Sequence, residues 1–256
     1  MKILVISDIH GNASALGAVL EVEQDADHII FLGDALLSGP QANETMTLLD
    51  GLTLDIAIMG NHDEEVLDPA IFQEWPAEWV ALNNWIIDQL EPGTADKLKQ
   101  FSGNGQYELD GLRMYLHHGE LERGKPAALP NATDNTFAEL DPGNDTDLVL
   151  FGHTHVQFQR QVAGRTYINP GSIGQPRCGR LHACYGVFLD GVYEPRQITY
   201  DPAPWLDALD NITPLKDLPD FHKWLREGLL NGYGIGEREP WTKFAAEGYC
   251  LSLIHI

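Results

Sequence analysis

Short apolar runs, most of them closed by a glycine, alternate along the chain with polar segments of helical periodicity. Runs of this kind predict buried strands, and they are ILVI at 3–6, IIFLG at 29–33, IAIMG at 56–60 and LVLFG at 148–152. Apolar residues at helical spacing predict helices over about 13–24 and 42–51, and two more within 76–101. The alternation is typical of an α/β fold.

The second half of the chain predicts further strands in hairpins. Asp110-Gly111 is a hairpin turn, and the chain 158–199 contains two more, with all four of its strands expected to complete a second sheet. The polar segment 120–146, rich in Pro, Gly and Asn, is a candidate lid. Residues 218–232 predict an amphipathic helix that ends at Gly232.

Asp, Asn or His follows each of the four apolar runs. Because ligands in open α/β sheets bind at the carboxyl ends of the strands, we expect these polar residues to converge. Asp8 and His10 lie two apart in extended chain, so both side chains should leave the same face, and the same holds for His153 and His155. The full set of candidates is Asp8, His10, Asp34, Asn61, His62, His118, His153 and His155.

The residue types in this set indicate metal binding. Carboxylate, imidazole and amide oxygen suit Mn²⁺, Fe or Zn²⁺, whereas a soft thiolate site would need cysteines, and this set has none. Two metals need more ligands than one, and a carboxylate can bridge them. Asp34 is the candidate bridge, because it is the only carboxylate of the set in its own turn. The sequence therefore predicts a site for two divalent metal ions.

The order of the motifs resembles that of the calcineurin-like metallophosphoesterases. The motifs are D-x-H at 8–10, G-D at 33–34, G-N-H-D at 60–63, H-G at 118–119 and G-H-x-H at 152–155. DIHGN, GDALLSGP and NPGSIGQPR look like the bacterial and archaeal single-domain phosphodiesterase subfamily. The resemblance covers about residues 1–200 and implies a four-layer α/β/β/α sandwich with two mixed sheets and the metal site between them.

The resemblance also divides the ligands between two metal ions. It gives metal one Asp8, His10, Asp34 and His155, and it gives metal two Asp34, Asn61, His118 and His153. The family has its ligand directly before the glycine, which is His118; the neighbouring His117 should point to the opposite face of its strand and is the alternative ligand. Mn²⁺ is the first candidate for both ions, and Fe, Zn²⁺ and Ni²⁺ are alternatives.

The resemblance implies that the protein hydrolyses phosphate esters. Two bound metals would bridge a water, lower its pKa toward about 7 and supply the hydroxide that attacks phosphorus. The family has a histidine near the leaving group, here His62, which would protonate it, and Asp63 is the candidate that holds the His62 ring. Arg177 and Asn12 are candidate substrate contacts, with hydrogen bonding inside a loop as the alternative role.

Two other functions stay open on the sequence. A non-catalytic scaffold can share the fold, as a retromer subunit that resembles this family does, but a scaffold need not keep every ligand. A Ser/Thr protein phosphatase would resemble GDYVDRG and GNHE, whereas this chain has GDALLSGP and GNHD. Because the ligand set and His62 are all present, the sequence favours a phosphodiesterase or phosphatase acting on a small organic phosphate.

Composition limits the partners and the compartment. The chain has 38 acidic and 16 basic residues and a formal net charge of -22, which disfavours stable nucleic-acid binding because phosphate contacts need Lys and Arg. No apolar run approaches the roughly 18 residues of a membrane span, and none at the start fits a signal peptide. Three cysteines without metal spacing indicate reduced thiols. We expect a cytoplasmic enzyme, and a homo-oligomer stays open.

The expected organisation has three parts. Residues 1–200 form the metallophosphoesterase domain, and residues 201–250 form a helical extension packed on the same domain. Residues 251–256, LSLIHI, are what a transposon-end adapter of sequencing libraries would encode. They are therefore either a non-native tail or a genuine apolar end.

Overall fold

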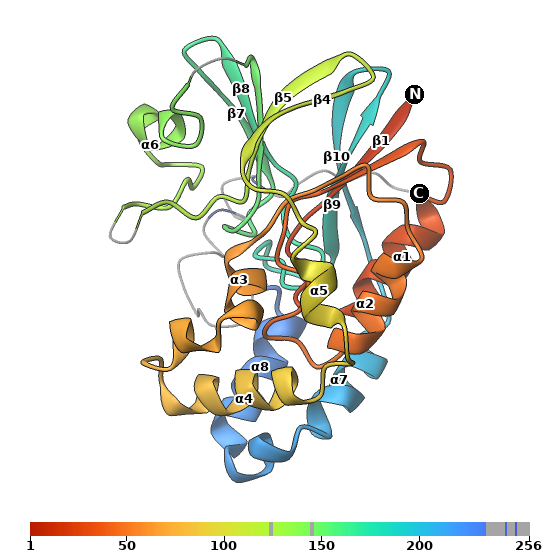
Figure 1. Cartoon of the computed structure of the whole chain (residues 1–256), viewed down its shortest axis with the longest axis vertical. Helices are drawn as coiled ribbons and strands as arrows, with labels where there is room; N and C mark the ends of the chain where they lie inside the picture. Colours follow the sequence, from red (N-terminus) through yellow and green to blue (C-terminus); the bar gives the residue numbers. More distant parts are fainter. Residues whose placement is uncertain (123–124, 144–145, 234–243, 245–248, 250–256) are drawn as a thin grey trace.

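Two mixed β-sheets lie face to face at the centre of the molecule (Figure 1). The computed structural model describes residues 1–122, 125–143, 146–233, 244 and 249, and all elements named below belong to these residues. The first sheet runs in the order β10 (Val192–Ile198), β9 (Ala183–Leu189), β1 (Lys2–Ile6), β2 (His28–Phe31) and β3 (Ile56–Ala57). Strands β1, β2 and β3 are parallel, and β9 pairs antiparallel with β1 and β10.

The second sheet has a parallel centre and two antiparallel edges. Its order is β4 (Gly105–Leu109), β5 (Leu112–His117), β6 (Leu148–Phe151), β8 (Arg165–Asn169) and β7 (Phe158–Val162). The predicted hairpins are present, and each turn has two residues with positive φ, such as Asp110 at 47° and Gly111 at 81°. One prediction is wrong: β9 and β10 do not complete this sheet, because β9 pairs with β1 in the first sheet.

Side-chain alternation along β1 explains why the sheets are covered on both faces. Ile3 and Val5 belong to an apolar cluster shared by the two sheets, whereas Leu4 and Ile6 belong to a cluster shared with the helices. Helices α1 (Ala13–Val22) and α2 (Ala42–Asp50) cover the first sheet, and α6 (Asp134–Ala138) covers the second (Figure 1). The four-layer α/β/β/α sandwich is therefore confirmed.

The outer layer on the second sheet comes from the segment that was expected to be a lid. Ala128, Phe137 and Leu140 are fully buried in a cluster with residues of β6, β7 and β8. A buried ion pair between Asp141 and Arg165 fixes the end of this segment to β8. The described residues 128–141 are thus a structural layer, and the lid prediction is wrong for them, because their apolar side chains have a sheet face to bury.

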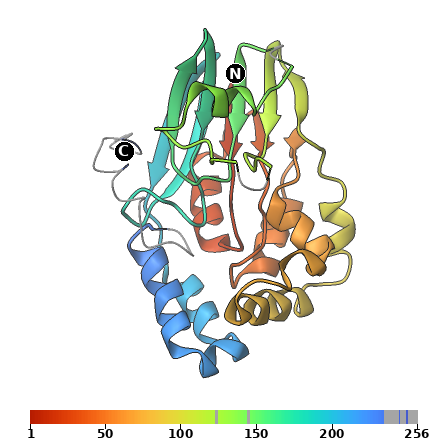
Figure 2. The same cartoon turned by 90° about the vertical axis from the view of Figure 1, so that its left-hand side faces the viewer.

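The remaining helices gather at the end of the molecule opposite the hairpins (Figures 1 and 2). They are α3 (Asn61–Leu67), α4 (Ala77–Asp88), α5 (Thr94–Leu98), α7 (Ala203–Asp210) and α8 (Pro219–Leu230), with 3-10 turns η1 (Pro69–Phe72) and η2 (Thr213–Asp217). Buried residues of α7 and α8, such as Trp205 and Leu225, share one apolar cluster with α1 and α2. The segment 251–256 lies outside the described residues.

None of the described helices combines the length and the apolar character that a membrane crossing would need.

Candidate metal centre

The seven predicted ligands meet where strands of both sheets end. Asp8 and His10 follow β1, Asp34 follows β2 and Asn61 follows β3 in the first sheet. From the second sheet, His118 follows β5, and His153 and His155 follow β6. Parallel strands of the two sheets thus bring these side chains to one place. The segments that carry the side chains are spread over most of the sequence of the sandwich.

Asp8, His10 and His155 form the first of three donor groups among the described residues. His155 Nε2 lies 3.2 Å from Asp8 Oδ1 and 3.0 Å from His10 Nε2. All three side chains are almost fully buried. This group corresponds to the set expected for metal one.

Asp34, His118 and His153 form the second donor group, with Asn61 between its two histidines. His118 Nε2 lies 3.1 Å from Asp34 Oδ2 and 3.1 Å from Asn61 Oδ1. His153 presents its Nδ1, which lies 2.9 Å from the same Asn61 oxygen. This group corresponds to the set expected for metal two.

Asp34 stands between the two groups. Its Oδ1 accepts a hydrogen bond from the His62 backbone N–H at 2.8 Å. Its Oδ2 is buried and has no hydrogen-bond partner, although it lies 3.1 Å from His118 Nε2 and 3.7 Å from His10 Nε2. A buried carboxylate oxygen without a donor is costly unless a cation binds it, so this atom fits a metal bridge.

Backbone conformation also marks the site. Five of the seven candidate ligands have positive φ: Asp8 at 54°, His10 at 49°, Asp34 at 64°, His153 at 65° and His155 at 59°. For non-glycine residues this region costs on the order of 1–3 kcal/mol and persists only where surrounding structure imposes it. The argument from extended chain is therefore wrong for His153 and His155, whose rings enter different donor groups.

Backbone carbonyls fix the rings of three histidines. Nδ1 of His118 lies 2.7 Å from the Leu32 carbonyl oxygen, and Nδ1 of His155 lies 2.8 Å from that of Gln175. Nδ1 of His10 hydrogen-bonds in the same way to the Leu37 carbonyl. A proton held at Nδ1 leaves Nε2 with its lone pair toward the donor group, which is the usual arrangement behind a metal-binding histidine.

Electrostatics favour a cation in this place. Burial would raise the pKa of Asp34, but His118 and His62 outweigh it and hold that pKa well below its ordinary value. Burial lowers the pKa of His153 to about 3 and that of His155 to about 4, so both rings are neutral at pH 7. Ionised carboxylates and neutral imidazoles are the protonation states that ligate metals. Burial lowers the pKa of His118, but Asp34 outweighs it and raises that pKa to about 10, so a metal ion bound at His118 would displace a proton from the ring. The oxygen and nitrogen donors of the site fit divalent ions.

His62 forms a third donor group with His10 and Asp34, but the partner of its Nδ1 is not the predicted one. Nδ1 of His62 lies 2.7 Å from Oε2 of Glu65, and its ring centre lies 5.1 Å from that of His10. Burial lowers the pKa of His62, but Asp34 and Glu65 outweigh it and raise the pKa to about 9. The ring therefore carries a proton at neutral pH.

The structure corrects the role predicted for Asp63. Its carboxylate is fully buried and accepts hydrogen bonds from the backbone N–H groups of Asp34, Ala35 and Gly60, at 2.8, 2.8 and 3.0 Å. Asp63 therefore ties the start of α3 to the loop after β2, and Glu65 takes the place beside the His62 ring. Glu65 was missed because the sequence analysis predicted no helix between residues 60 and 76, whereas the chain is helical from Asn61.

The two predicted substrate contacts differ in their surroundings. Asn12 is fully buried: its Oδ1 caps α1 through Ala15 N–H, and its Nδ2 donates to Gly174 O and Tyr200 Oη, each at 3.0 Å. The substrate role for Asn12 is therefore wrong, and the alternative of loop bonding holds. Arg177 is half-buried next to the site, with Nη1 donating to the Thr154 carbonyl at 3.2 Å.

His117 and His118 are adjacent in sequence, but only His118 lies among the candidate ligands. Nδ1 of His117 accepts a hydrogen bond from Gly119 N–H at 2.8 Å, and His117 belongs to none of the three donor groups. Burial also lowers the pKa of His117 to about 4.

On the other side of the site, the Trp75 ring stands edge-on to His62, with ring centres 6.2 Å apart. Trp75 thus borders the approach to His62.

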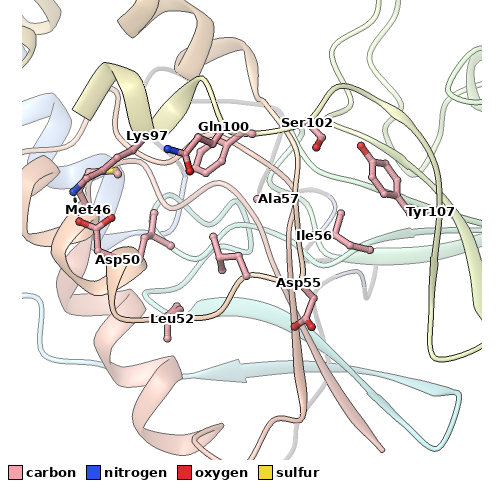
Figure 3. Close-up of a pocket in the computed structure, with 13 residues that line it drawn as sticks. Met46, Asp50, Leu52, Asp55, Ile56, Ala57, Lys97, Gln100, Ser102 and Tyr107 are labelled. Atoms are coloured by element: carbon pink, nitrogen blue, oxygen red, sulfur yellow. Dashed lines mark hydrogen bonds and ion pairs between the residues drawn. The ribbon is translucent and has the colours of Figure 1, made fainter. Parts of the chain in front are cut away.

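A cavity of about 420 Å³ lies beside β3, away from the ligands (Figure 3). Met46, Ile56 and Ala57 line it together with an ion pair between Lys97 and Asp50. No candidate ligand lines this cavity, so it is separate from the metal centre.

The chain is similar to known proteins in sequence and in structure. Residues 1–188 match the calcineurin-like phosphoesterase superfamily domain. The chain is 28% identical over 203 residues to phosphodiesterase YfcE of Escherichia coli, covering 75% of this chain and 89% of YfcE. It is also 28% identical over 223 residues to an uncharacterised protein of Methanocaldococcus jannaschii, covering 78% and 88%.

A solved structure has the same architecture. A metallophosphoesterase from Sphaerobacter thermophilus is 26% identical and superimposes with a TM-score of 0.66, over 84% of this chain and 99% of that one. The YfcE similarity agrees with the expected relation to the single-domain phosphodiesterases. With the family match covering most of the chain and its ligand motifs meeting in one place, this chain belongs to the calcineurin-like phosphoesterase superfamily and is a phosphoric ester hydrolase.

Proposed function

We propose that this protein hydrolyses small organic phosphate esters with two divalent metal ions. Asp8, His10, Asp34 and His155 would hold one ion, and Asp34, Asn61, His118 and His153 the other. The observation that carries the proposal is Asp34 Oδ2, a buried oxygen without a hydrogen-bond partner between two donor groups. Mn²⁺ is the first candidate for both ions, and Fe, Zn²⁺ and Ni²⁺ also accept these ligands.

The chain's own residues supply binding, orientation and a proton. When bound, the two ions would offset charge on the phosphoryl oxygens and supply a nucleophilic water at neutral pH. His62, held at Nδ1 by Glu65, has Nε2 left to protonate the departing alkoxide. Arg177 would contact a phosphoryl oxygen. Burial of the donor groups keeps bulk water away from these charges, which strengthens each interaction.

Metal removal tests the proposal. Chelated protein should be inactive toward bis-p-nitrophenyl phosphate, and Mn²⁺ should restore the activity, because both the nucleophile and the charge stabilisation depend on the metals. Measuring activity against Mn²⁺, Fe²⁺, Zn²⁺ and Ni²⁺, together with metal content, identifies the working ion. A panel of phosphate monoesters, diesters and cyclic nucleotides then defines the substrate class.

Asp34→Asn should lower occupancy of both ions, because it weakens the bridge, and should reduce the rate at least as much as any other single ligand change. Asp96→Asn is the matched control, since the Asp96 side chain is 81% exposed and pairs with Lys99 at the surface. Full activity of the chelated protein would refute the proposal. Two bound ions without activity on any ester would favour the scaffold alternative.

A further inference from the structure

Two buried thiols lie together beside the metal centre. Cys178 follows Arg177 in the loop after β8, and Cys184 is the second residue of β9. Their side chains are 2% and 0% exposed, and neither cysteine is in a disulfide bond. The two Sγ atoms are 3.9 Å apart, whereas a disulfide bond is about 2.05 Å long, so a small shift would bring them to bonding distance.

The two cysteines differ in how firmly the structure holds them. Cys184 lies in β9, which pairs with β1 on one side and β10 on the other, and its N–H donates to the Ser172 carbonyl at 3.0 Å. Cys178 lies in a loop without regular secondary structure. If a bond forms, the loop around Cys178 must therefore move more than the strand.

The loop around Cys178 also hydrogen-bonds to His155, a candidate metal ligand. The Gln175 carbonyl lies 2.8 Å from Nδ1 of His155, and the Arg177 N–H donates to the His155 carbonyl at 3.3 Å. Both contacts lie within three residues of Cys178. A shift of the loop would therefore turn the His155 ring or pull its backbone, and His155 is one of three residues in its donor group.

We propose that Cys178 and Cys184 are a site of reversible oxidation to an intramolecular disulfide, and that closing this bond weakens metal binding by His155. The second part rests on the proposed role of His155 as a ligand. The oxidant is hydrogen peroxide. One thiolate attacks the peroxide oxygen to give a sulfenic acid and water, and the other thiol displaces a second water to form the S–S bond. Two thiols lose two electrons, and the peroxide gains them.

The surroundings suit the first of these steps. The hydrogen bond from Cys184 lowers the pKa of the Cys178 thiol, and Arg180 adds to this, although burial opposes both. Cys178 is therefore the better candidate for the attacking thiolate, and Cys184 for the resolving thiol.

Peptide mapping of the zinc-loaded protein tests the bond itself. Zn²⁺ has no redox chemistry and does not cycle with peroxide. After treatment with hydrogen peroxide, a peptide pair linking Cys178 to Cys184 should appear, lighter by two hydrogen atoms, and dithiothreitol should remove it. Cys178→Ser and Cys184→Ser should each abolish the linked pair. Cys250→Ser, which changes the third cysteine of the chain, should leave it in place.

Metal affinity tests the coupling. The oxidised protein should bind Zn²⁺ at one of its two sites about 10- to 100-fold more weakly, the range for loss of a hydrogen-bond partner behind a metal-binding histidine. Cys184→Ala, treated with the same peroxide, should keep its affinity. A link through Cys250, or no link at all, overturns the proposed bond. A Cys178–Cys184 link with unchanged Zn²⁺ affinity overturns the coupling, whereas failure of both untreated sites to bind metal contradicts the proposed function instead.

Discussion

Glu65 and His62 show how one residue contact sets the chemistry available at the site. Glu65 is buried, with 3% of its surface exposed, and its carboxylate is hydrogen-bonded to Nδ1 of His62. The ring is then fixed with its other nitrogen available to a substrate. Glu64, its neighbour in α3, is exposed and makes no such contact among the described residues. The pair Glu64 and Glu65 therefore offers a matched comparison.

Glu65→Ala should slow hydrolysis of an alkyl phosphate ester about 10- to 100-fold, because the His62 ring loses its orientation. Loss should be smaller for a p-nitrophenyl ester, whose leaving group departs without a proton. Glu65→Gln should recover much of the rate, since its amide oxygen still accepts from Nδ1, and Glu64→Ala should have little effect. Steady-state rates on both esters, with metal content measured for each variant, provide the check.

His62→Ala sets the upper limit, about 10²–10⁴-fold on the alkyl ester. If Glu65 acts only through His62, adding Glu65→Ala to His62→Ala should cost nothing further. If Glu65→Ala slows hydrolysis of both esters equally and its metal content falls, then Glu65 supports α3 or the ligands and does not orient a proton donor.

At the scale of elements, the sequence predicts what depends on local pattern. The apolar runs predict β1, β2, β3 and β6, Pro92-Gly93 separates α4 from α5, and the hairpin turns are where the Gly residues place them. All seven predicted ligands meet because strand ends converge in any such sheet. Which sheet β9 joins depends on long-range pairing with β1, and no local pattern carries that information.

Helix α3 explains the error at Asp63. Gly60 is the N-cap of α3, and Asp63, three residues on, accepts a hydrogen bond from the Gly60 N–H at 3.0 Å. This is half of a capping box, and its Asp at the third helical position was an available signal for a helix start. In a helix, residues three apart share a face, so Glu65 meets the His62 ring and Asp63 turns away.

The junction between β3 and α3 has no room for a side chain. An added Cβ at Gly60 would lie 2.2 Å from Oδ1 and 2.5 Å from the backbone nitrogen of Asp34. Gly60→Ala should therefore displace the Asp34 carboxylate and lower occupancy of both metals. In contrast, a Cβ at Gly17 in α1 would lie 3.9 Å from its nearest neighbour, Leu48. Gly17→Ala should keep both metals and stabilise the fold by up to about 1 kcal/mol.

Metal content and thermal unfolding of these two variants separate the effects. Because Gly60 has φ of -99° and ψ of 169°, alanine adopts its backbone conformation without strain, and any loss comes from the contact with Asp34. Normal metal content in Gly60→Ala would show that the loop after β2 can yield, and that the approach of Gly60 to Asp34 is not required.

At the scale of the whole molecule, contacts join the two sheets at both ends. At one end the candidate ligands come from both sheets. At the other, His28 of β2 lies between two carboxylates: Nδ1 is 2.9 Å from Asp55 Oδ1, and Nε2 is 2.9 Å from Oδ2 of Asp110 in the β4–β5 turn. Hydrogen bonds from the His28 ring to Asp55 and Asp110 raise the pKa of His28 above its ordinary value, although burial opposes this.

This raised pKa predicts the sign of a pH effect on stability. The protonated ring binds both carboxylates, so its stabilising contribution should be complete below the unfolded pKa of about 6.5 and decline as the pH rises through the folded value. In the metal-loaded protein, His28→Gln should therefore lower Tm most near about pH 6 and least near about pH 9. Asp110→Asn should reduce the same pH dependence, because it removes the acceptor on the second sheet. A Tm deficit of His28→Gln that grows with pH would show that the neutral ring, and not the charged one, holds the two sheets together at this end.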